Sequence, residues 1–232
     1  MAFLSLRAAA LAALSLLGPA AADFRVKFDV ETTGGPSSFT VLVHEDWAPI
    51  GAAHFKELVQ AKFYDDTRFF RVIPTFMVQF GLSGDPKIST EWRSKTIQDE
   101  PVKVSNKPGY MTFAKTGAPN SRTSQLFINY VDNGRLDGMG FSPFGEVEGD
   151  GMSVVKQIFN CGESPNQGQI QSEGNSYLDR SFAKLSKIIK ASVVESSEDP
   201  VRVLLLWALQ SRVPGTCCAK LWRISWLLGA RS

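Results

Sequence analysis

Short apolar segments separated by turn residues run through the middle of the chain, and they constrain its fold more than any other feature. Segments of four to seven residues are too short for ordinary helices and are typical of β-strands. Five of them follow one another: Arg68–Ile73, Phe76–Phe80, Tyr110–Phe113, Leu126–Tyr130 and Phe141–Val147. We therefore expect a mainly β domain.

Alternating apolar residues predict further strands near both ends of this region. Residues 24–30 alternate between apolar and polar side chains, as do residues 39–43, and Thr33-Gly34-Gly35-Pro36 separates the two segments. This pattern predicts a β-hairpin. The segment Ile188–Val194 predicts one more strand at the end of the domain.

Two segments have the apolar spacing of helices. The first covers Ile50–Ala61 and follows Pro49, a residue suited to the first turn of a helix. The second covers residues 151–159. Many short strands with two helices indicate a barrel or a sandwich whose open ends are covered by helices.

The scarcity of histidine and cysteine excludes several kinds of chemistry. The chain has two His and three Cys, and none of them has the spacing of a zinc site. The glycine-rich loops that bind nucleotides and the nucleophile elbow of hydrolases are absent from the sequence. We expect no metal and no cofactor, and His44 and His54 are interpreted as packed or solvated. A net charge of +2 is too small to indicate nucleic-acid binding.

The two ends of the chain differ from the middle. Residues 1–22 carry Arg7, an apolar run and a small-residue cleavage site, which is the layout of a secretory signal peptide. This predicts the secretory pathway, either the endoplasmic reticulum lumen or secretion. A buried core helix is the alternative.

The tail at residues 197–232 is basic and rich in tryptophan. It is either an appendage outside the fold or an amphipathic segment that binds a membrane or a partner. The domain itself is expected to cover residues 23–196.

One segment carries the most specific chemical information. Phe69-Phe70-Arg71-Val72-Ile73-Pro74-Thr75-Phe76-Met77-Val78-Gln79 places an arginine within a strongly apolar run. A buried arginine is unfavourable unless other groups satisfy it. Arg71 and Gln79 are eight residues apart and would share a face of an uninterrupted strand, but Pro74 and Thr75 make such a strand unfavourable.

This segment resembles the F-H-R-x-I-x-x-F-M-x-Q signature of the cyclophilin peptidyl-prolyl isomerases. Two further blocks resemble that family in the same order, residues 113–129 and then residues 136–147. The resemblance covers about residues 24–195. It implies a closed eight-stranded antiparallel β-barrel capped by two α-helices, and an enzyme that rotates X-Pro peptide bonds.

The resemblance also implies roles for individual residues. Arg71 is the catalytic arginine, and Asn120 lies in a loop beside the peptide groove. The other residues bind substrate: Phe76, Met77, Phe127 and Leu136 hold the proline ring, Gln79, Ala114 and Gln125 line the groove, and Phe141 belongs to the same set.

Proline isomerisation suits such a site because no covalent bond is broken. The barrier of about 18–20 kcal/mol comes from amide resonance, so the reaction needs no nucleophile or metal. In the twisted amide the prolyl nitrogen becomes a hydrogen-bond acceptor, to which a guanidinium can donate.

Several positions depart from the family pattern. Phe70 stands where many members have His, Phe80 where Gly is usual, and Arg135 where cyclosporin-sensitive members have Trp. Phe141 lies near another position that is often His. We expect activity to persist, with weak or no cyclosporin binding, and aromatic residues in place of His to reshape the groove.

The expected partners are proline-containing peptides and folding proteins in the secretory pathway, and the expected state is a monomer. The alternative is a cyclophilin-like module or scaffold that binds proline peptides with little turnover.

Overall fold

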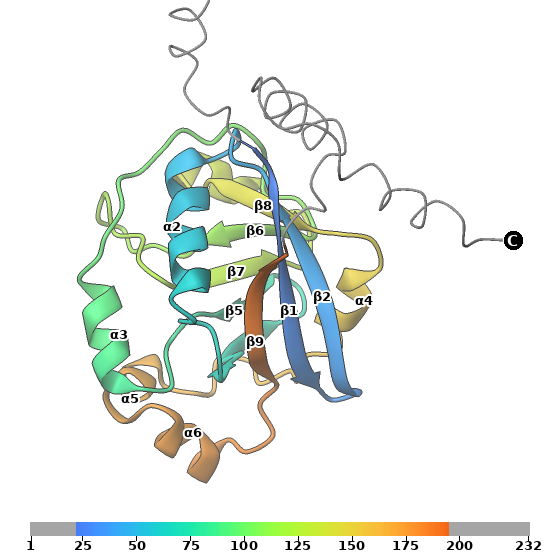
Figure 1. Ribbon diagram of the computed structural model, residues 1–232, viewed down its shortest axis with the longest axis vertical. Helices are drawn as coiled ribbons and strands as arrows, with labels where there is room; N and C mark the ends of the chain where they lie inside the picture. The colour runs from blue at the N-terminus through green and yellow to red at the C-terminus, as the bar shows by residue number, and fades with distance from the viewer. Residues whose placement is uncertain (1–21, 195–232) are drawn as a thin grey trace, which may run out of the picture. The chain divides into compact units, whose positions relative to one another are not determined.

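The computed structural model describes residues 22–194, which form an antiparallel sheet with helices around it (Figure 1). Residues 1–21 of the predicted signal peptide and the whole of the predicted tail lie outside the described residues. Nine strands are joined in the order β3-β9-β1-β2-β8-β6-β7-β5-β4. The mainly β prediction is confirmed.

The predicted hairpin is formed by β1, Phe24–Thr32, and β2, Gly35–Val43. The register pairs Phe24 with Val43 and Thr32 with Gly35, so Thr33 and Gly34 make the connection. Gly35 has a φ of +96°, which favours glycine there. The last strand, β9, covers Lys187–Val194 and pairs with β1.

The short apolar segments form the remaining strands. Their bounds are β3 Thr67–Arg68, β4 Arg71–Ile73, β5 Met77–Phe80, β6 Tyr110–Phe113, β7 Leu126–Asn129 and β8 Pro143–Val147. Each was predicted to within two residues, except that the expected strand Arg68–Ile73 is divided between β3 and β4.

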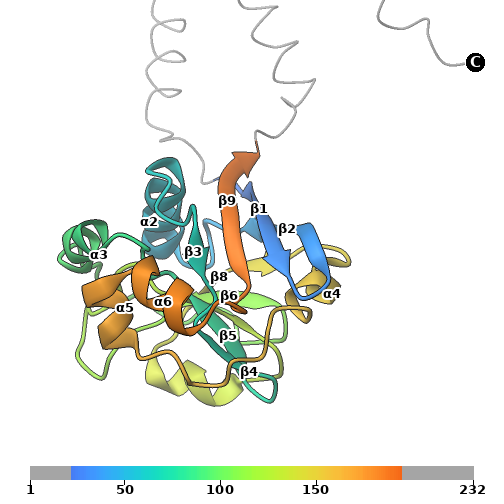
Figure 2. The ribbon, with the colours of Figure 1, turned by 90° about the horizontal axis from the view of Figure 1, so that it is seen from below.

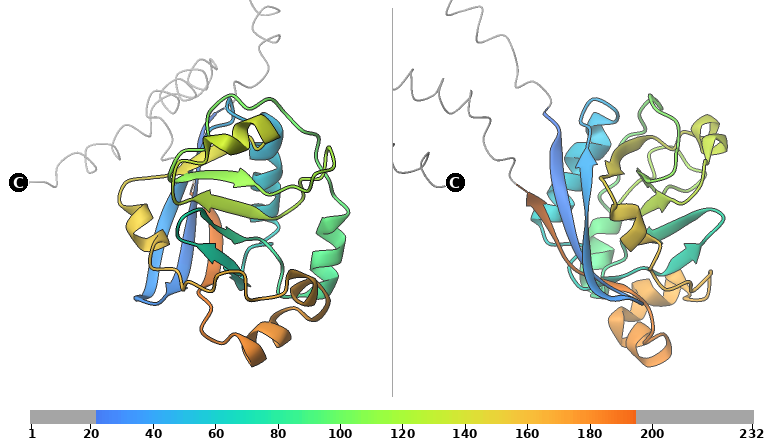
Figure 3. Two further views of the ribbon diagram at one scale, coloured as in Figure 1. Left: turned by 180° about the vertical axis from the view of Figure 1, so that it is seen from behind. Right: turned by 90° about the vertical axis from the view of Figure 1, so that its right-hand side faces the viewer.

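The expectation of a closed eight-stranded barrel is wrong, because the sheet is an open half-barrel whose edge strands β3 and β4 do not pair (Figure 3). Only two residues, Phe69 and Phe70, connect these edge strands. The Phe69 N–H donates to the Ser186 carbonyl beside β9, whereas the Phe70 N–H donates to the Gln79 carbonyl in β5. Strands of two and three residues leave no ladder to join the edges.

The expectation of two helices is also wrong. The described residues contain five α-helices: α2 Pro49–Gln60, α3 Pro86–Arg93, α4 Gly151–Val155, α5 Gln167–Glu173 and α6 Asn175–Ser181. The first predicted helix matches α2 to within one residue. The second ends early, because after Val155 the backbone turns tightly and the Gln157 carbonyl accepts hydrogen bonds from Thr33.

Local capping explains two helices that the apolar pattern did not predict. The Asp85 side chain accepts from the Lys87 N–H at the start of α3, and Pro86 follows in the first turn. The Asn166 side chain accepts from the Gln169 N–H at the start of α5. Figure 2 shows α3, α5 and α6 grouped together, and contacts join α5 to both neighbours.

The main core lies between the concave face of the sheet and α2. Aromatic rings dominate it, and Phe144 packs against both Phe55 and Phe113 with ring centroids 5.1 Å apart. In β5 and β7, alternate residues face this core, namely Val78 and Phe80, and Leu126 and Ile128. The residues between them therefore face the opposite side of the sheet.

Within residues 22–194, the helices lack the combination of length and apolar character that crossing a bilayer requires.

Candidate active site

The β4–β5 hairpin places Arg71 directly opposite Gln79. Pro74 and Thr75 form the turn, which the Phe76 N–H closes by donating to the Ile73 carbonyl over 2.8 Å. The two side chains therefore share a face of the sheet because of antiparallel pairing. An uninterrupted strand is not needed, and Pro74 suits the turn through its fixed φ.

A chain of side-chain hydrogen bonds runs inward from Arg71. The Arg71 Nη1 donates to Gln79 Oε1 over 3.3 Å, and Gln79 Nε2 donates to Gln125 Oε1 over 2.8 Å. Gln79 is buried with 8% of its surface exposed, so its amide is fixed between two partners. The structure thus brings together three of the predicted site residues.

Sequence reasoning missed a carboxylate on the other side of the arginine. Arg71 Nε and Nη2 both donate to Glu163 Oε1, over 2.9 Å and 2.5 Å. Glu163 is 92 residues away from Arg71 in the chain. No signal near Arg71 in the sequence indicates this contact.

The predicted proline pocket forms an apolar cluster separate from the main core. Met77, Phe127 and Leu136 are its buried members, with at most 6% of their surface exposed. Partly buried residues pack around them: Ile73, Phe76, Ala114 and Phe141. The cluster therefore contains every apolar residue of the predicted site.

The aromatic rings of this pocket lie beside Arg71. Phe127 and Phe141 meet edge to face with centroids 5.9 Å apart. The Arg71 guanidinium carbon lies 5.8 Å from the centroid of Phe76. A cation thus borders an apolar pocket, and the low dielectric there strengthens its hydrogen bonds.

A buried polar network holds the 3₁₀ helix η1, Gly134–Met139, which carries Leu136. Asp137 Oδ1 accepts hydrogen bonds from the backbone N–H and the side-chain amide of Asn106. Asn133 donates to the Phe76 carbonyl and to Asn129. These bonds fix one wall of the pocket.

The ionisation of Asp137 makes the stability of this pocket wall depend on pH. Burial alone raises the pKa of its carboxyl, but hydrogen bonds from Ser105 and Asn106 outweigh burial and hold the pKa below the ordinary value of an aspartate. Because the folded-state pKa is lowered, the ionised Asp137 carboxylate stabilises the folded state fully above the unfolded-state pKa. This stabilisation is lost as the pH falls through the folded-state pKa.

We therefore expect Asp137→Asn to lower the free energy of unfolding at pH 7 by about 1–2 kcal/mol, because a charge-assisted acceptor is lost. The loss of stability between pH 6 and pH 3 should also be smaller than in the wild type. Thermal unfolding across this range measures both. Asp150→Asn is the control, since the exposed Asp150 carboxylate accepts no hydrogen bond from the described residues; equal acid sensitivity in all three proteins would contradict the expectation.

Two cavities border the Arg71–Gln79 pair, one lined by Gln79 and the other by Arg71. One of about 360 Å³ is lined by Gln79, Ala114 and Gln125 together with Gln167 and Gln171 of α5. The other, of about 530 Å³, is lined by Arg71, Glu163 and residues 165–168. The predicted groove residues thus line one cavity together with two residues of α5, Gln167 and Gln171.

The residues that depart from the family pattern lie in different parts of the structure. Phe70 and Phe80 are buried in the main core, at 1% and 0% exposure, so neither ring lines the groove directly. Phe141 does lie at the pocket. Arg135 lies over Phe76, with its guanidinium carbon 4.6 Å from the ring centroid, and is exposed at the rim.

The remaining candidates lie away from the arginine. Asn120 has a φ of +55° and holds its loop to Asp99 through two hydrogen bonds. His54 is packed, with Nε2 2.8 Å from the Thr123 carbonyl. His44 lies close to Asp23 and Asp46, just outside the ends of β1 and β2, and neither of these strands pairs with β4.

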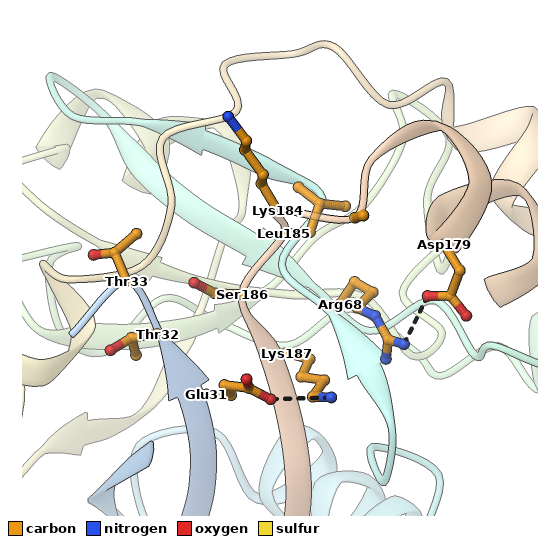
Figure 4. Close-up of a pocket in the computed structure, with 10 residues that line it drawn as sticks. Glu31, Thr32, Thr33, Arg68, Asp179, Lys184, Leu185, Ser186 and Lys187 are labelled. Carbon is orange, nitrogen blue, oxygen red and sulfur yellow. Dashed lines mark hydrogen bonds and ion pairs between the residues drawn. The ribbon is translucent and has the colours of Figure 1, made fainter. Parts of the chain in front are cut away.

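A further polar pocket lies beside β3 and β9 and contains no predicted site residue (Figure 4). Four of its five charged side chains are already paired, Arg68 with Asp179 over 3.1 Å and Lys187 with Glu31 over 3.0 Å, and only Lys184 has no ion pair within the described residues. We therefore place the candidate site at Arg71.

A comparison with known protein families identifies the family to which this chain belongs. The family model described as cyclophilin type peptidyl-prolyl cis-trans isomerase/CLD matches residues 27–175, more than half of the 232-residue chain. The chain belongs to this family. It is a cyclophilin-type peptidyl-prolyl cis-trans isomerase, as its resemblance implied.

Individual relatives agree with the family. Peptidyl-prolyl cis-trans isomerase B of Escherichia coli is 37% identical over 122 residues, which are 49% of this chain and 73% of that protein. Peptidyl-prolyl cis-trans isomerase-like 1 of Aspergillus oryzae is 31% identical over 175 residues, 74% of this chain and 98% of that protein.

A solved structure supports the cyclophilin fold. The cyclophilin-type isomerase of Cryptosporidium parvum superposes with a TM-score of 0.54 at 18% identity, covering 75% of this chain and 99% of that one.

Proposed function

We propose that Arg71 is the catalytic residue of this cyclophilin and that the Met77–Phe127–Leu136 cluster binds the proline ring of the substrate. One observation carries this proposal: the guanidinium of Arg71 borders the only apolar cluster that the described residues form outside the main core. A proline ring held there has its nitrogen within reach of a cation.

Arg71 has donors left for the substrate. A guanidinium has five N–H bonds, and Glu163 and Gln79 accept three of them. One hydrogen on Nη1 and one on Nη2 remain. Either can donate to the prolyl nitrogen when the amide twists and the nitrogen loses its resonance.

This interaction is stronger in the twisted state than in either planar state, so it lowers the barrier. Uncatalysed isomerisation takes about 10–100 s. A turnover near ~10³ s⁻¹ requires about 7 kcal/mol of transition-state stabilisation. A charge-assisted hydrogen bond at an apolar pocket, with the flanking peptide held in place, is suited to supply it.

The groove supports binding of the flanking peptide. Gln79 and Gln125 offer amide donors and acceptors, and Ala114 leaves room beside them in the 360 Å³ cavity. One flank of the peptide is held here while the other rotates with the proline.

The rate of isomerisation of an X-Pro peptide with the full chain tests this function. Acceleration that saturates with substrate supports the enzyme. Saturable binding without acceleration would favour the alternative, a proline-peptide binding module or scaffold.

We also propose that the enzyme assists protein folding in the secretory pathway. The support is the layout of residues 1–22 in the sequence, of which residues 1–21 lie outside the described residues. Translation with microsomes tests this: cleavage before Asp23 supports the proposal, and a chain that keeps residues 1–22 outside the vesicles contradicts it.

The structure supports two of the other expectations. Weak cyclosporin binding agrees with the exposed charge of Arg135 at the pocket rim. A monomer agrees with the scattering of the exposed large apolar residues over four elements: Ile50 in α2, Ile88 in α3, Met139 in η1, and Ile189 and Val194 in β9.

A further inference from the structure

The turn after Cys161 sets a carboxylate against the side of Arg71 that faces away from Gln79. Glu163 Oε1 accepts from Nε over 2.9 Å and from Nη2 over 2.5 Å. We propose that Glu163 is a positioning residue, which holds the guanidinium of Arg71 in the orientation that the isomerase reaction needs. This inference rests on the proposed catalytic role of Arg71.

The turn that carries Glu163 is anchored next to Arg71 itself. The Val72 N–H in β4 donates to the Gly162 carbonyl over 2.9 Å, and the Ser164 N–H closes the turn on the Cys161 carbonyl. Cys161 and Pro165 are buried on either side. The turn therefore delivers Glu163 to a fixed place relative to β4, although its side chain is 64% exposed.

Most exposed ion pairs contribute little, because two long side chains must be ordered to make them. In this pair, other contacts already order the Arg71 side chain, so less order is lost when the pair forms. Arg71 is fixed by its strand and by Gln79, and its side chain is only 27% exposed. Glu163 Oε1 accepts hydrogen bonds from two N–H groups of Arg71, which fixes the plane of the guanidinium as well as its position.

Glu163 occupies the edge formed by Nε and Nη2, and so leaves the end of the guanidinium for the substrate. Its carboxylate also reduces the local positive charge, which by itself would weaken catalysis. A neutral acceptor of the same shape should therefore orient Arg71 as well as Glu163 does. Removal of the acceptor frees the guanidinium to rotate away from the productive geometry.

The test compares Glu163→Ala with Glu163→Gln in the full chain. We expect Glu163→Ala to lower kcat about tenfold with little change in KM, because orientation matters most in the transition state. Glu163→Gln should restore kcat to within about twofold of the wild type or above it. In an Arg71→Ala background, Glu163→Ala should have no further effect, since Glu163 acts through Arg71.

The control is Glu173→Ala, which removes another exposed carboxylate that pairs with an arginine, Arg180, over 2.9 Å. It should leave kcat unchanged. The Nε–H signal of Arg71 in ¹⁵N NMR gives a readout independent of turnover: it should be protected from exchange in the wild type and in Glu163→Gln, and unprotected in Glu163→Ala.

The proposal is overturned if Glu163→Ala keeps or exceeds the wild-type kcat, or if Glu163→Gln falls as far as Glu163→Ala. It is also overturned if the Arg71 Nε–H signal is the same in all three proteins. A wild-type chain that does not accelerate isomerisation contradicts the proposed function instead, and the NMR signal then decides the positioning of Arg71 by itself.

Discussion

Arg71→Ala is expected to lower kcat/KM for an X-Pro peptide by about 10²–10³-fold while the fold is retained. Loss of one preorganised donor to developing charge has an effect of this size in other enzymes. The apolar cluster and the groove remain in the variant, so peptide binding should weaken much less than turnover. Rates from a proline-isomerisation assay, with peptide affinity measured separately, check both parts.

Two further variants show whether the effect belongs to this arginine. Arg71→Lys keeps the charge but loses the planar fork, and it should recover only part of the rate. Arg25→Ala removes an arginine on β1 that pairs with Glu148, and it should have no effect on rate. A rate for Arg71→Ala within about twofold of the wild type would show that Arg71 is not catalytic.

Arg122→Ala is expected to destabilise the domain by about 3–5 kcal/mol, because it breaks a buried ion pair. Arg122 is 1% exposed, and its Nη1 donates to Glu100 Oε1 over 2.7 Å. A second bond joins its Nη2 to the Gln98 carbonyl. The Glu100 side chain is 4% exposed, so the substitution leaves a nearly buried carboxylate without its cation.

Glu100 also caps a helix, which adds to the destabilisation expected for Arg122→Ala. Its two carboxylate oxygens accept from the Ile50 and Gly51 N–H groups at the start of α2, where Ala48 offers no side-chain cap. Arg122 therefore supports both the loop before β7 and the N-terminus of α2.

Denaturant unfolding measures the effect of Arg122→Ala. The matched control is again Arg25→Ala, whose exposed pair with Glu148 should contribute at most about 1 kcal/mol. A loss of less than 1 kcal/mol for Arg122→Ala would mean that the buried cluster does not support the fold.

Local patterns predicted the strands well, but only two of the five α-helices in the described residues. The alternation in residues 24–43 determined the β1–β2 hairpin, and the helical spacing after Pro49 determined α2. In contrast, α3 was missed because only Ser89 and Trp92 are buried in it, which gives no apolar stripe. Its Asp85-Pro86 capping signal was nevertheless present in the sequence.

The open sheet follows from interactions that local sequence does not show. The run Arg68–Ile73 looks like one strand, but Phe69 and Phe70 direct their N–H groups to opposite edges of the sheet. The partner of Phe69, Ser186, lies beside β9, more than a hundred residues further along the chain.

The candidate site was predictable where a motif carries it and not elsewhere. The three family blocks together identified Arg71, Gln79 and the apolar residues, and the structure brings them close together. The contribution of Glu163 depends on a turn that only tertiary contact with β4 places beside Arg71. A carboxylate at that distance in sequence gives no local signal.

The most direct test of the central claim is exchange NMR of an X-Pro peptide at equilibrium with a small amount of the full chain. This measurement sees rotation itself, without a coupled protease. The account predicts cis–trans exchange cross-peaks that appear with the wild type and fade with Arg71→Ala. Peptide shifts that show binding without any exchange would contradict it.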